Sequence, residues 1–214
     1  TFIAPNEIVF DVTRDIVCGH HVMRDLTLIV KLAGKLDAYT PMHLLYEMLE
    51  DGGCYKMARL EAHWEYAAMN KQVIAHGFAA LPILMGMVGR MLKHLGWRGM
   101  LAFGESGKTV GESGKSQVKT FADALSKRDQ PALLDVFEED EAVVHFPYGE
   151  PPITVAAFLA EFDGSMHFSK LLAAGDRVTA TLSVQSKGQN RDGVALFDFN
   201  PKTLKLRKLV FYVE

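Results

Sequence analysis

The sequence predicts an α+β protein in which curved antiparallel sheets pack on helices, in two successive units. Three patterns support this fold class. Apolar residues alternate within residues 7–64, helix-forming residues fill 65–95, and helices followed by strands occupy the chain after residue 116. Helices that feed an antiparallel sheet are typical of α+β domains. At 214 residues, the chain is long enough for two domains of about 100 residues each.

The first third reads as an antiparallel meander. Ile8–Thr13 alternates β-branched residues, and Asp51-Gly52-Gly53 has the composition of a hairpin turn. The expected strands are Glu7–Cys18, His21–Lys31, Pro41–Glu50 and Tyr55–Trp64.

Between Glu65 and Leu95 the sequence becomes rich in Ala, Met, Leu, Lys and Gln, which favour helix. Pro82 is expected to break or kink this segment into two helices. Its methionines are interpreted as core residues, because Met at helical spacing fills apolar gaps.

A five-residue unit, Gly-Glu-Ser-Gly-Lys, is written twice within residues 104–115. Each copy ends like a phosphate-binding loop, but that loop needs a glycine five residues before its Gly-Lys pair. Ala102 and Thr109 hold those positions, so neither copy matches. The composition predicts a flexible linker between two domains.

The remaining chain predicts helices first and strands afterwards. Pro131 sits at a favoured first-turn position of a helix. The expected helices are Ser116–Lys127, Pro131–Phe137 and Pro152–Glu161, and the expected strands are Ala142–Phe146, His167–Ala173, Arg177–Ser186, Gly193–Asn200 and Leu206–Val213.

This order, and the stretch from Phe137 to Pro152 with its acidic turn, short strand and Pro-aromatic-Gly turn, resembles the nuclear transport factor two / ketosteroid isomerase superfamily. The resemblance implies a cone-shaped sheet with a pocket between sheet and helices. In ketosteroid isomerases the pocket holds a Tyr, an Asp base and a protonated Asp. Those places fall on Phe121, Phe146 and Ala195 here, so the resemblance implies a second domain unable to isomerise by that mechanism.

Strand parity extends this apolar interior. If Ala195 faces the pocket, so do Phe197 and Phe199, and Phe211 takes the same parity on the last strand. We therefore name Phe121, Phe146, Ala195, Phe197 and Phe211 as the lining of a cone that is either packed shut or holds an apolar ligand.

The meander 7–64 resembles the closing sheet of the same superfamily, with Trp64 where an aromatic residue lines the pocket. The resemblance therefore divides the chain into an incomplete domain, 1–103, a linker, 104–115, and a complete domain, 116–214. Arg24, Tyr46 and Trp64 are the expected ligand contacts of the first domain. Equally, Trp64 could belong to the core and Arg24 could pair with a surface Asp.

Composition limits the partners. The net charge of −3, without a long basic run, does not favour nucleic acid. The apolar stretch 73–89 is too short and too interrupted to span a bilayer, so no membrane partner is expected. Cys18 and Cys54 are expected to be reduced thiols in a cytoplasmic protein that needs no metal or cofactor. The chain begins without Met, which suggests that residues upstream are missing.

Three functions stay open. The first is binding of an apolar small molecule by a chain whose two cones pack through their sheets as a pseudo-dimer. The second is an isomerase, dehydratase or cyclase acting in the first domain, which requires a cavity bordered by a carboxylate or histidine with a shifted pKa. The third is a structural module whose Met-rich segment, 65–95, docks a partner or forms a homodimer.

Overall fold

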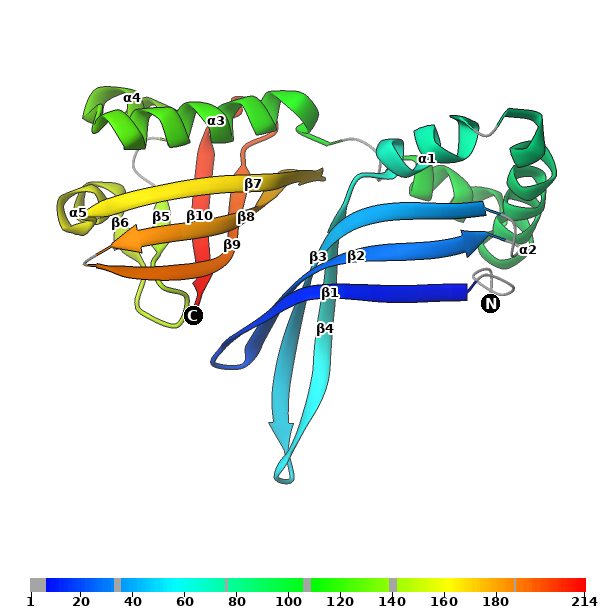
Figure 1. The fold of residues 1–214 in the computed structure, drawn as a ribbon, viewed down its shortest axis with the longest axis horizontal. Helices are drawn as coiled ribbons and strands as arrows, with labels where there is room; N and C mark the ends of the chain where they lie inside the picture. The colour runs from blue at the N-terminus through cyan, green and yellow to red at the C-terminus, as the bar shows by residue number, and fades with distance from the viewer. Residues whose placement is uncertain (1–6, 33–35, 76, 106–108, 139–141, 187) are drawn as a thin grey trace.

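The computed structural model describes residues 7–32, 36–75, 77–105, 109–138, 142–186 and 188–214. It contains a four-stranded antiparallel sheet, a six-stranded sheet that is mostly antiparallel, and several helices, in agreement with the predicted α+β class (Figure 1). We call residues 7–105 the front half and residues 109–214 the rear half.

The front sheet is a four-stranded antiparallel meander in the order β1-β2-β3-β4. Its strands are β1 (Glu7–Cys18), β2 (His21–Leu32), β3 (Leu36–Asp51) and β4 (Cys54–Trp64). All four predicted strands are present, and β3 begins at Leu36 rather than at Pro41. The turn between β3 and β4 uses Gly52 and Gly53 at φ of 62° and 79°, a region that suits glycine.

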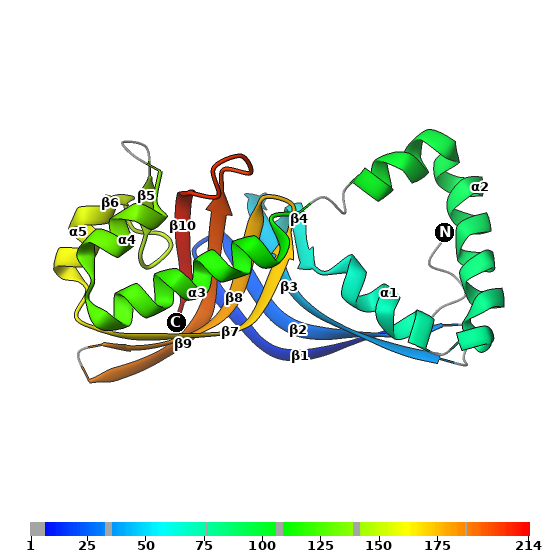
Figure 2. The ribbon, with the colours of Figure 1, turned by 90° about the horizontal axis from the view of Figure 1, so that it is seen from above.

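The segment after β4 is helical and interrupted near Pro82, as predicted, but it extends to Glu105 rather than Leu95. The core interpretation of its methionines holds for Met91 but was wrong for Met85, which is 69% exposed. It consists of α1 (Tyr66–Ala75), a 3₁₀ turn, η1 (Gly77–Ala80), and α2 (Leu81–Glu105), which bends at Gly96 (φ 66°, ψ 178°). Pro82 lies in the first turn of α2, where a missing N–H costs nothing. The helix α1 packs on the front sheet, and α2 lies at the opposite end of the molecule from α5 (Figures 1 and 2).

The rear half has helices on one face of a six-stranded sheet in the order β6-β5-β10-β9-β8-β7. Only β5 and β10 pair in parallel. The helices are α3 (Gly111–Lys127), α4 (Gln130–Val136) and α5 (Val155–Glu161), and the strands are β5 (Val143–His145), β6 (Ile153–Thr154), β7 (Gly164–Ala174), β8 (Arg177–Ser186), β9 (Gln189–Phe199) and β10 (Leu206–Val213).

The linker prediction was wrong at its C-terminal end. The helix α3 begins at Gly111, so the second Gly-Glu-Ser-Gly-Lys unit forms its first turns instead of an open loop. Most of the first unit, residues 106–108, lies outside the described residues. Val110, just before α3, donates a backbone hydrogen bond to Gly175 O (2.9 Å), which ties the helix start to the β7–β8 turn.

The two sheets meet face to face. Ile16, Met23 and Leu45 of the front sheet pack on the outward side chains of β9 and β10, including Val194 and Tyr212. These outward residues alternate with the inward Ala195 and Phe211, so each central rear strand contacts its helices on one side and the front sheet on the other.

Candidate functional site

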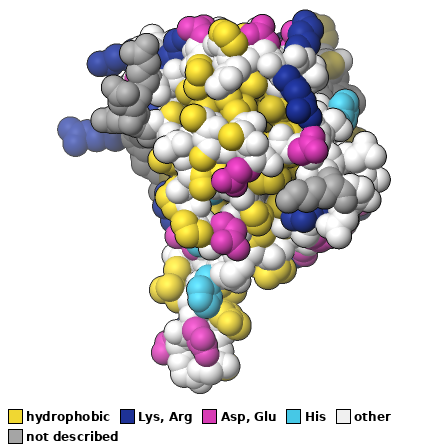
Figure 3. All heavy atoms as spheres, turned by 90° about the vertical axis from the view of Figure 1, so that its left-hand side faces the viewer, with side chains coloured by type: hydrophobic (Ala, Val, Ile, Leu, Met, Phe, Trp, Pro, Cys, Tyr) yellow, Lys and Arg dark blue, Asp and Glu magenta, His cyan; other side chains and the backbone are white. Residues whose placement is uncertain are grey.

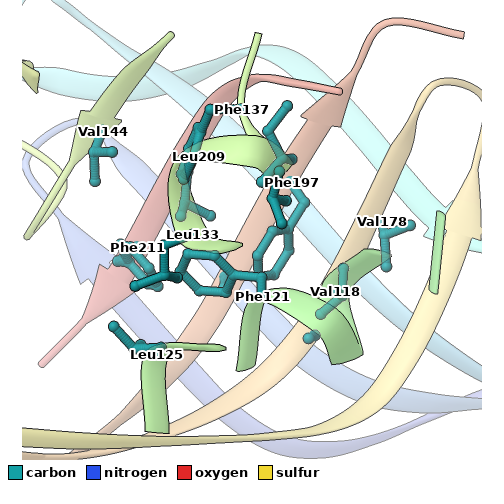
Figure 4. Close-up of a cluster of buried hydrophobic side chains, with 14 of the residues drawn as sticks. Val118, Phe121, Leu125, Leu133, Phe137, Val144, Val178, Phe197, Leu209 and Phe211 are labelled. Atoms are coloured by element: carbon teal, nitrogen blue, oxygen red, sulfur yellow. The ribbon is translucent and has the colours of Figure 1, made fainter. Parts of the chain in front are cut away.

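The predicted cone residues share one interior. Phe121, from α3, is completely buried and lies 5.7 Å from the ring of Phe197 and 6.0 Å from that of Phe137 (ring centroids; Figure 4). Ala195 and Phe197 are also fully buried. Edge-to-face contacts of this kind are typical of a packed aromatic core.

Phe146 and Phe211 continue this core toward one end of the rear half. Their ring centroids are 5.2 Å apart, and Ala195 pairs with Phe211 across β9 and β10. Phe121 and Ala195 therefore belong to a single buried hydrophobic cluster, and Phe146 packs against it. Hydrocarbon side chains occupy the positions where the resemblance places acid/base groups.

The interior leaves little room. At its end, a cavity of about 230 Å³ is lined by Phe146, Phe158, Phe162 and Val184 together with the polar Gln189 and Arg191. Figure 3, which looks onto this end of the molecule, shows hydrophobic side chains gathered between charged ones. Ligand pockets for drug-sized molecules usually measure about 300–1,000 Å³.

The three residues predicted for the front half lie on one face of the front sheet. Tyr46 and Trp64 pack with Leu26 and Leu44, and the Arg24 guanidinium lies 5.7 Å from the centre of the Tyr46 ring. Arg24 also donates two hydrogen bonds to Asp15 (2.6 and 2.7 Å). Of the three, only Trp64 borders one of the described cavities.

The opposite face of the front sheet carries a buried polar cluster that sequence reasoning missed. Asp25 is 3% exposed and accepts hydrogen bonds from Lys170 Nζ (2.5 Å) and Thr181 Oγ1 (2.7 Å), both in the rear sheet. Burial alone would raise the pKa of Asp25, but the hydrogen bonds from Lys170 and Thr181 hold it below its ordinary value.

His43 completes this cluster. Its Nδ1 lies 2.8 Å from Thr179 Oγ1, and its Nε2 lies 3.1 Å from Thr181 Oγ1 and 3.6 Å from Asp25 Oδ1. Complete burial lowers the pKa of His43 and keeps the ring neutral at neutral pH. Because these side chains are buried and hydrogen-bonded to one another, we interpret the cluster as a structural contact that joins the two sheets.

A signal for this cluster was present in the sequence. Asp25, His43 and His63 stand opposite one another on β2, β3 and β4, with parity opposite to Leu26, Leu44 and Trp64. The alternation of side chains along each strand could be read from the sequence. Finding the cluster also required the strand register, the location of Lys170, and the knowledge that the rear sheet covers this face.

The largest described cavity is a groove of about 1120 Å³ at the junction of the two halves. We call it the junction groove. It lies between the β4–α1 connection on one side and the start of α3 with the β7–β8 turn on the other. Trp64 and Tyr66 form an aromatic pair on its front side, with ring centroids 5.8 Å apart at 76°.

His63 also borders the junction groove, and its imidazole is 4% exposed. Neither ring nitrogen has a hydrogen-bond partner, which is unusual for a buried polar group. Burial lowers the pKa of His63 to about 4, against the opposing effect of Glu61, whose Oε2 lies 3.6 Å from Nε2. The ring is therefore neutral at neutral pH.

Several charged groups around the groove are paired with each other. Glu61 contacts Arg177 (2.5 Å) and Arg59 (2.8 Å), and Arg177 also binds Asp198 (3.0 Å). Glu65 accepts from the backbone N of Ala173 (3.1 Å) and pairs with Lys115 (2.5 Å). These pairs fix the groove walls and leave His63 as a polar group there whose bonding capacity is unused.

Comparisons with known proteins give matches among solved structures only. No family model matches the sequence, and no curated protein matches it. Among solved structures, a provisionally assigned ketosteroid isomerase of Kribbella flavida is 17% identical, covers 50% of this chain and 81% of its own, and has a TM-score of 0.44. A nuclear transport factor two-like protein of unknown function from Cytophaga hutchinsonii is 16% identical, covers 47% of this chain and 89% of its own, and scores 0.42.

A provisionally assigned polyketide cyclase of Shewanella denitrificans is 15% identical, covers 47% of this chain and 90% of its own, and has a TM-score of 0.41. At such identities the likeness concerns the fold alone. These are the protein types that the sequence resembles, and each match covers about half of this chain. Site chemistry has to be argued from the chain itself.

Within the described part of the chain, no group of three or more His, Cys, Asp and Glu side chains is placed to hold a metal ion. No helix there is long and apolar enough to cross a bilayer.

Proposed function

We propose that this protein binds a small, largely apolar molecule in the junction groove, and that its rear half does not isomerise steroids. The observation that carries the binding site is the groove of about 1120 Å³, with an aromatic pair on one side and the unpartnered ring of His63. An apolar wall with a few placed polar groups is the usual composition of a small-molecule site.

The rear interior is a poorer candidate. Phe121, Phe146 and Ala195 occupy the places of the expected acid/base groups, and none of these side chains transfers a proton or stabilises an oxyanion. The cavity of about 230 Å³ beside Phe146 is also smaller than the usual ligand pocket. Of the two alternatives left open by the sequence, we therefore favour a rear cone that is packed shut, and we propose the groove as the ligand site.

The groove also indicates the chemistry of its ligand. Glu61 is paired with Arg177, and Glu65 is paired with Lys115, so a charged ligand that bound these side chains would have to break existing ion pairs. A neutral, flat molecule could stack beside Trp64 without that cost. A hydroxyl or carbonyl on such a molecule would supply the partner that His63 lacks.

The test uses Trp64 as a reporter. The chain has two tryptophans, so the substitution Trp97→Phe leaves Trp64 alone. We expect flat aromatic alcohols and ketones from a fragment library to change its fluorescence saturably, and His63→Leu to weaken the best of them about tenfold, as loss of one buried hydrogen bond predicts.

Phe162→Leu, at the rear cavity, is the matched control, because it alters a different space, adds no tryptophan and should leave this affinity unchanged. If Phe162→Leu abolishes binding while His63→Leu does not, the ligand lies in the rear cone and the proposal is wrong. Absence of any saturable change across the library would also contradict it.

One observation favours a second candidate, an acid/base enzyme acting at the same groove. His63 is a histidine with a strongly lowered pKa that borders a cavity, next to the Glu61 carboxylate. Against it, Arg24 and Tyr46, the other predicted contacts, border none of the described cavities. Turnover of a bound carbonyl compound that His63→Gln removes, while binding persists, would distinguish catalysis from binding.

A further inference from the structure

The segment from Gly77 to Gly104 differs from the rest of the chain in charge. It contains Arg90, Lys93 and Arg98 and no Asp or Glu. Since the whole chain has a formal charge of −3, the residues outside this segment carry −6. A cationic helix on an otherwise acidic protein is attracted to anionic surfaces that the rest of the molecule avoids.

The helix α2 also presents an apolar stripe to solvent. Leu81, Met85, Val88, Leu92 and Leu95 recur every three or four residues and are between 38% and 69% exposed. This spacing places them on one side of the helix. On the same helical geometry Lys93 and His94 lie well away from the stripe, and both are exposed.

Exposed apolar residues also follow the bend at Gly96. Trp97 is 64% exposed and Leu101, four residues later, is 53% exposed, with Arg98 exposed between them. Phe78, in the preceding 3₁₀ turn, is 95% exposed. Aromatic residues next to cations are typical of segments that lie at the boundary between headgroups and acyl chains.

We propose that η1 and α2 form an amphipathic anchor that lies on the surface of an anionic lipid bilayer. The apolar stripe would enter the acyl boundary, while Lys93 and Arg98 would meet lipid phosphates and carboxylates. The segment lies on the bilayer and does not cross it, because its glycines and cations interrupt the apolar run.

A second copy of the chain is a weaker occupant. Two such helices would bring together segments that each carry three Lys or Arg residues, and the single acidic residue of α2, Glu105 at its end, is too few to compensate them. Anionic lipid provides both an apolar phase and the missing negative charge. The position of α2 at one end of the molecule, beyond the front sheet, leaves it accessible to a flat surface (Figures 1 and 2).

The experiment is flotation of the full chain with vesicles of phosphatidylcholine containing about one third phosphatidylserine, compared with phosphatidylcholine alone. We expect binding to the anionic vesicles that weakens at high salt. Lys93→Glu should reduce the partition coefficient at least about fivefold, and the exposed Lys202→Glu, outside the segment, should leave it unchanged.

The apolar stripe has a closely matched control in Leu134 of α4. Leu95 is 42% exposed and Leu134 is 45% exposed, so both accept Glu without disturbing the core. Leu95→Glu should weaken vesicle binding at least about tenfold, and Leu134→Glu should not change it. Circular dichroism of both variants checks that they fold.

A third measurement locates the contact. In a Trp64→Phe variant, Trp97 is the sole tryptophan, and its emission should shift to the blue on anionic vesicles and be quenched by brominated lipid. Absence of binding to anionic vesicles overturns the proposal. So does a lipid-free oligomer that Leu95→Glu dissociates while vesicle binding is absent, because α2 would then be a protein interface.

Discussion

Asp25→Ala is the substitution that most directly tests how the two sheets are joined. It removes the acceptor of Lys170 Nζ (2.5 Å) and of Thr181 Oγ1 (2.7 Å) from a site that is 3% exposed. Removing one partner of a buried ion pair costs about 3–5 kcal/mol, because the other charge stays buried without compensation. The Lys170 side chain is 21% exposed and also donates to Leu26 O, so we expect about 3 kcal/mol.

The assay is equilibrium unfolding in urea, followed by far-UV circular dichroism and by tryptophan fluorescence. Asp15→Ala is the matched control. It removes the two hydrogen bonds that Arg24 donates between neighbouring front strands, but its side chain is 39% exposed. An exposed pair of this kind contributes about 0–1 kcal/mol. The two variants therefore differ mainly in burial.

The double variant Asp25→Leu with Lys170→Met removes both charges at once. Replacing a buried pair with apolar groups of similar volume is often neutral, so we expect it to recover most of the loss. If Asp25→Ala costs no more than Asp15→Ala, then Asp25 is not buried against the rear sheet. The face-to-face arrangement of the sheets would then be refuted.

Three further predictions concern the core and the histidines. Phe121→Ala should lower the free energy of unfolding by about 3–5 kcal/mol, measured by denaturant titration, because it empties a fully buried ring position. Gly193→Ala should destabilise by about 2 kcal/mol or more in the same assay, since an added Cβ would lie 2.1 Å from the Tyr212 carbonyl oxygen. Burial lowers the pKa of His63 to about 4, so below pH 6.5 the unfolded chain binds a proton at this ring that the folded protein does not, and the free energy of unfolding should fall by about 3 kcal/mol as the pH drops from 6.5 toward 4. His63→Leu should make the unfolding free energy less sensitive to pH in that window, and an unchanged slope would mean that the ring is hydrated in the folded state.

The strands were the most predictable part of the structure. β1, β8 and β10 begin and end at the expected residues, because each is rich in β-branched or aromatic residues, which favour strands. The predicted start of α3, Ser116, was wrong, because the helix begins at Gly111. Glycine and serine in residues 111–115 disfavour helix locally, but Val110 is fixed to the β7–β8 turn, and Gly114 fits against Val110 and Val178, where a larger side chain would not.

The candidate site was only partly predictable. Parity placed Trp64 on one face and His63 on the other, and both border the junction groove because it lies at the end of β4, where the strand turns into α1. Its far wall comes from Ala173–Arg177 and the start of α3, more than 40 residues later in the chain. No local pattern links these segments, since their contact depends on how one sheet lies on the other.

The distribution of exposed apolar residues distinguishes the two halves. Among the described residues, every exposed large hydrophobic side chain except Leu134 lies in the front half or its helices. The rear half buries its apolar residues between its helices and its sheet, and then covers the outer face of that sheet with β1–β4. A folded protein seldom leaves so much apolar surface uncovered unless it has something to contact. The rear half holds the front sheet through the Asp25 cluster and through the outer face of β9 and β10. The two proposed binding surfaces therefore differ in origin, because the junction groove is lined by both halves whereas α2 belongs to the front half alone.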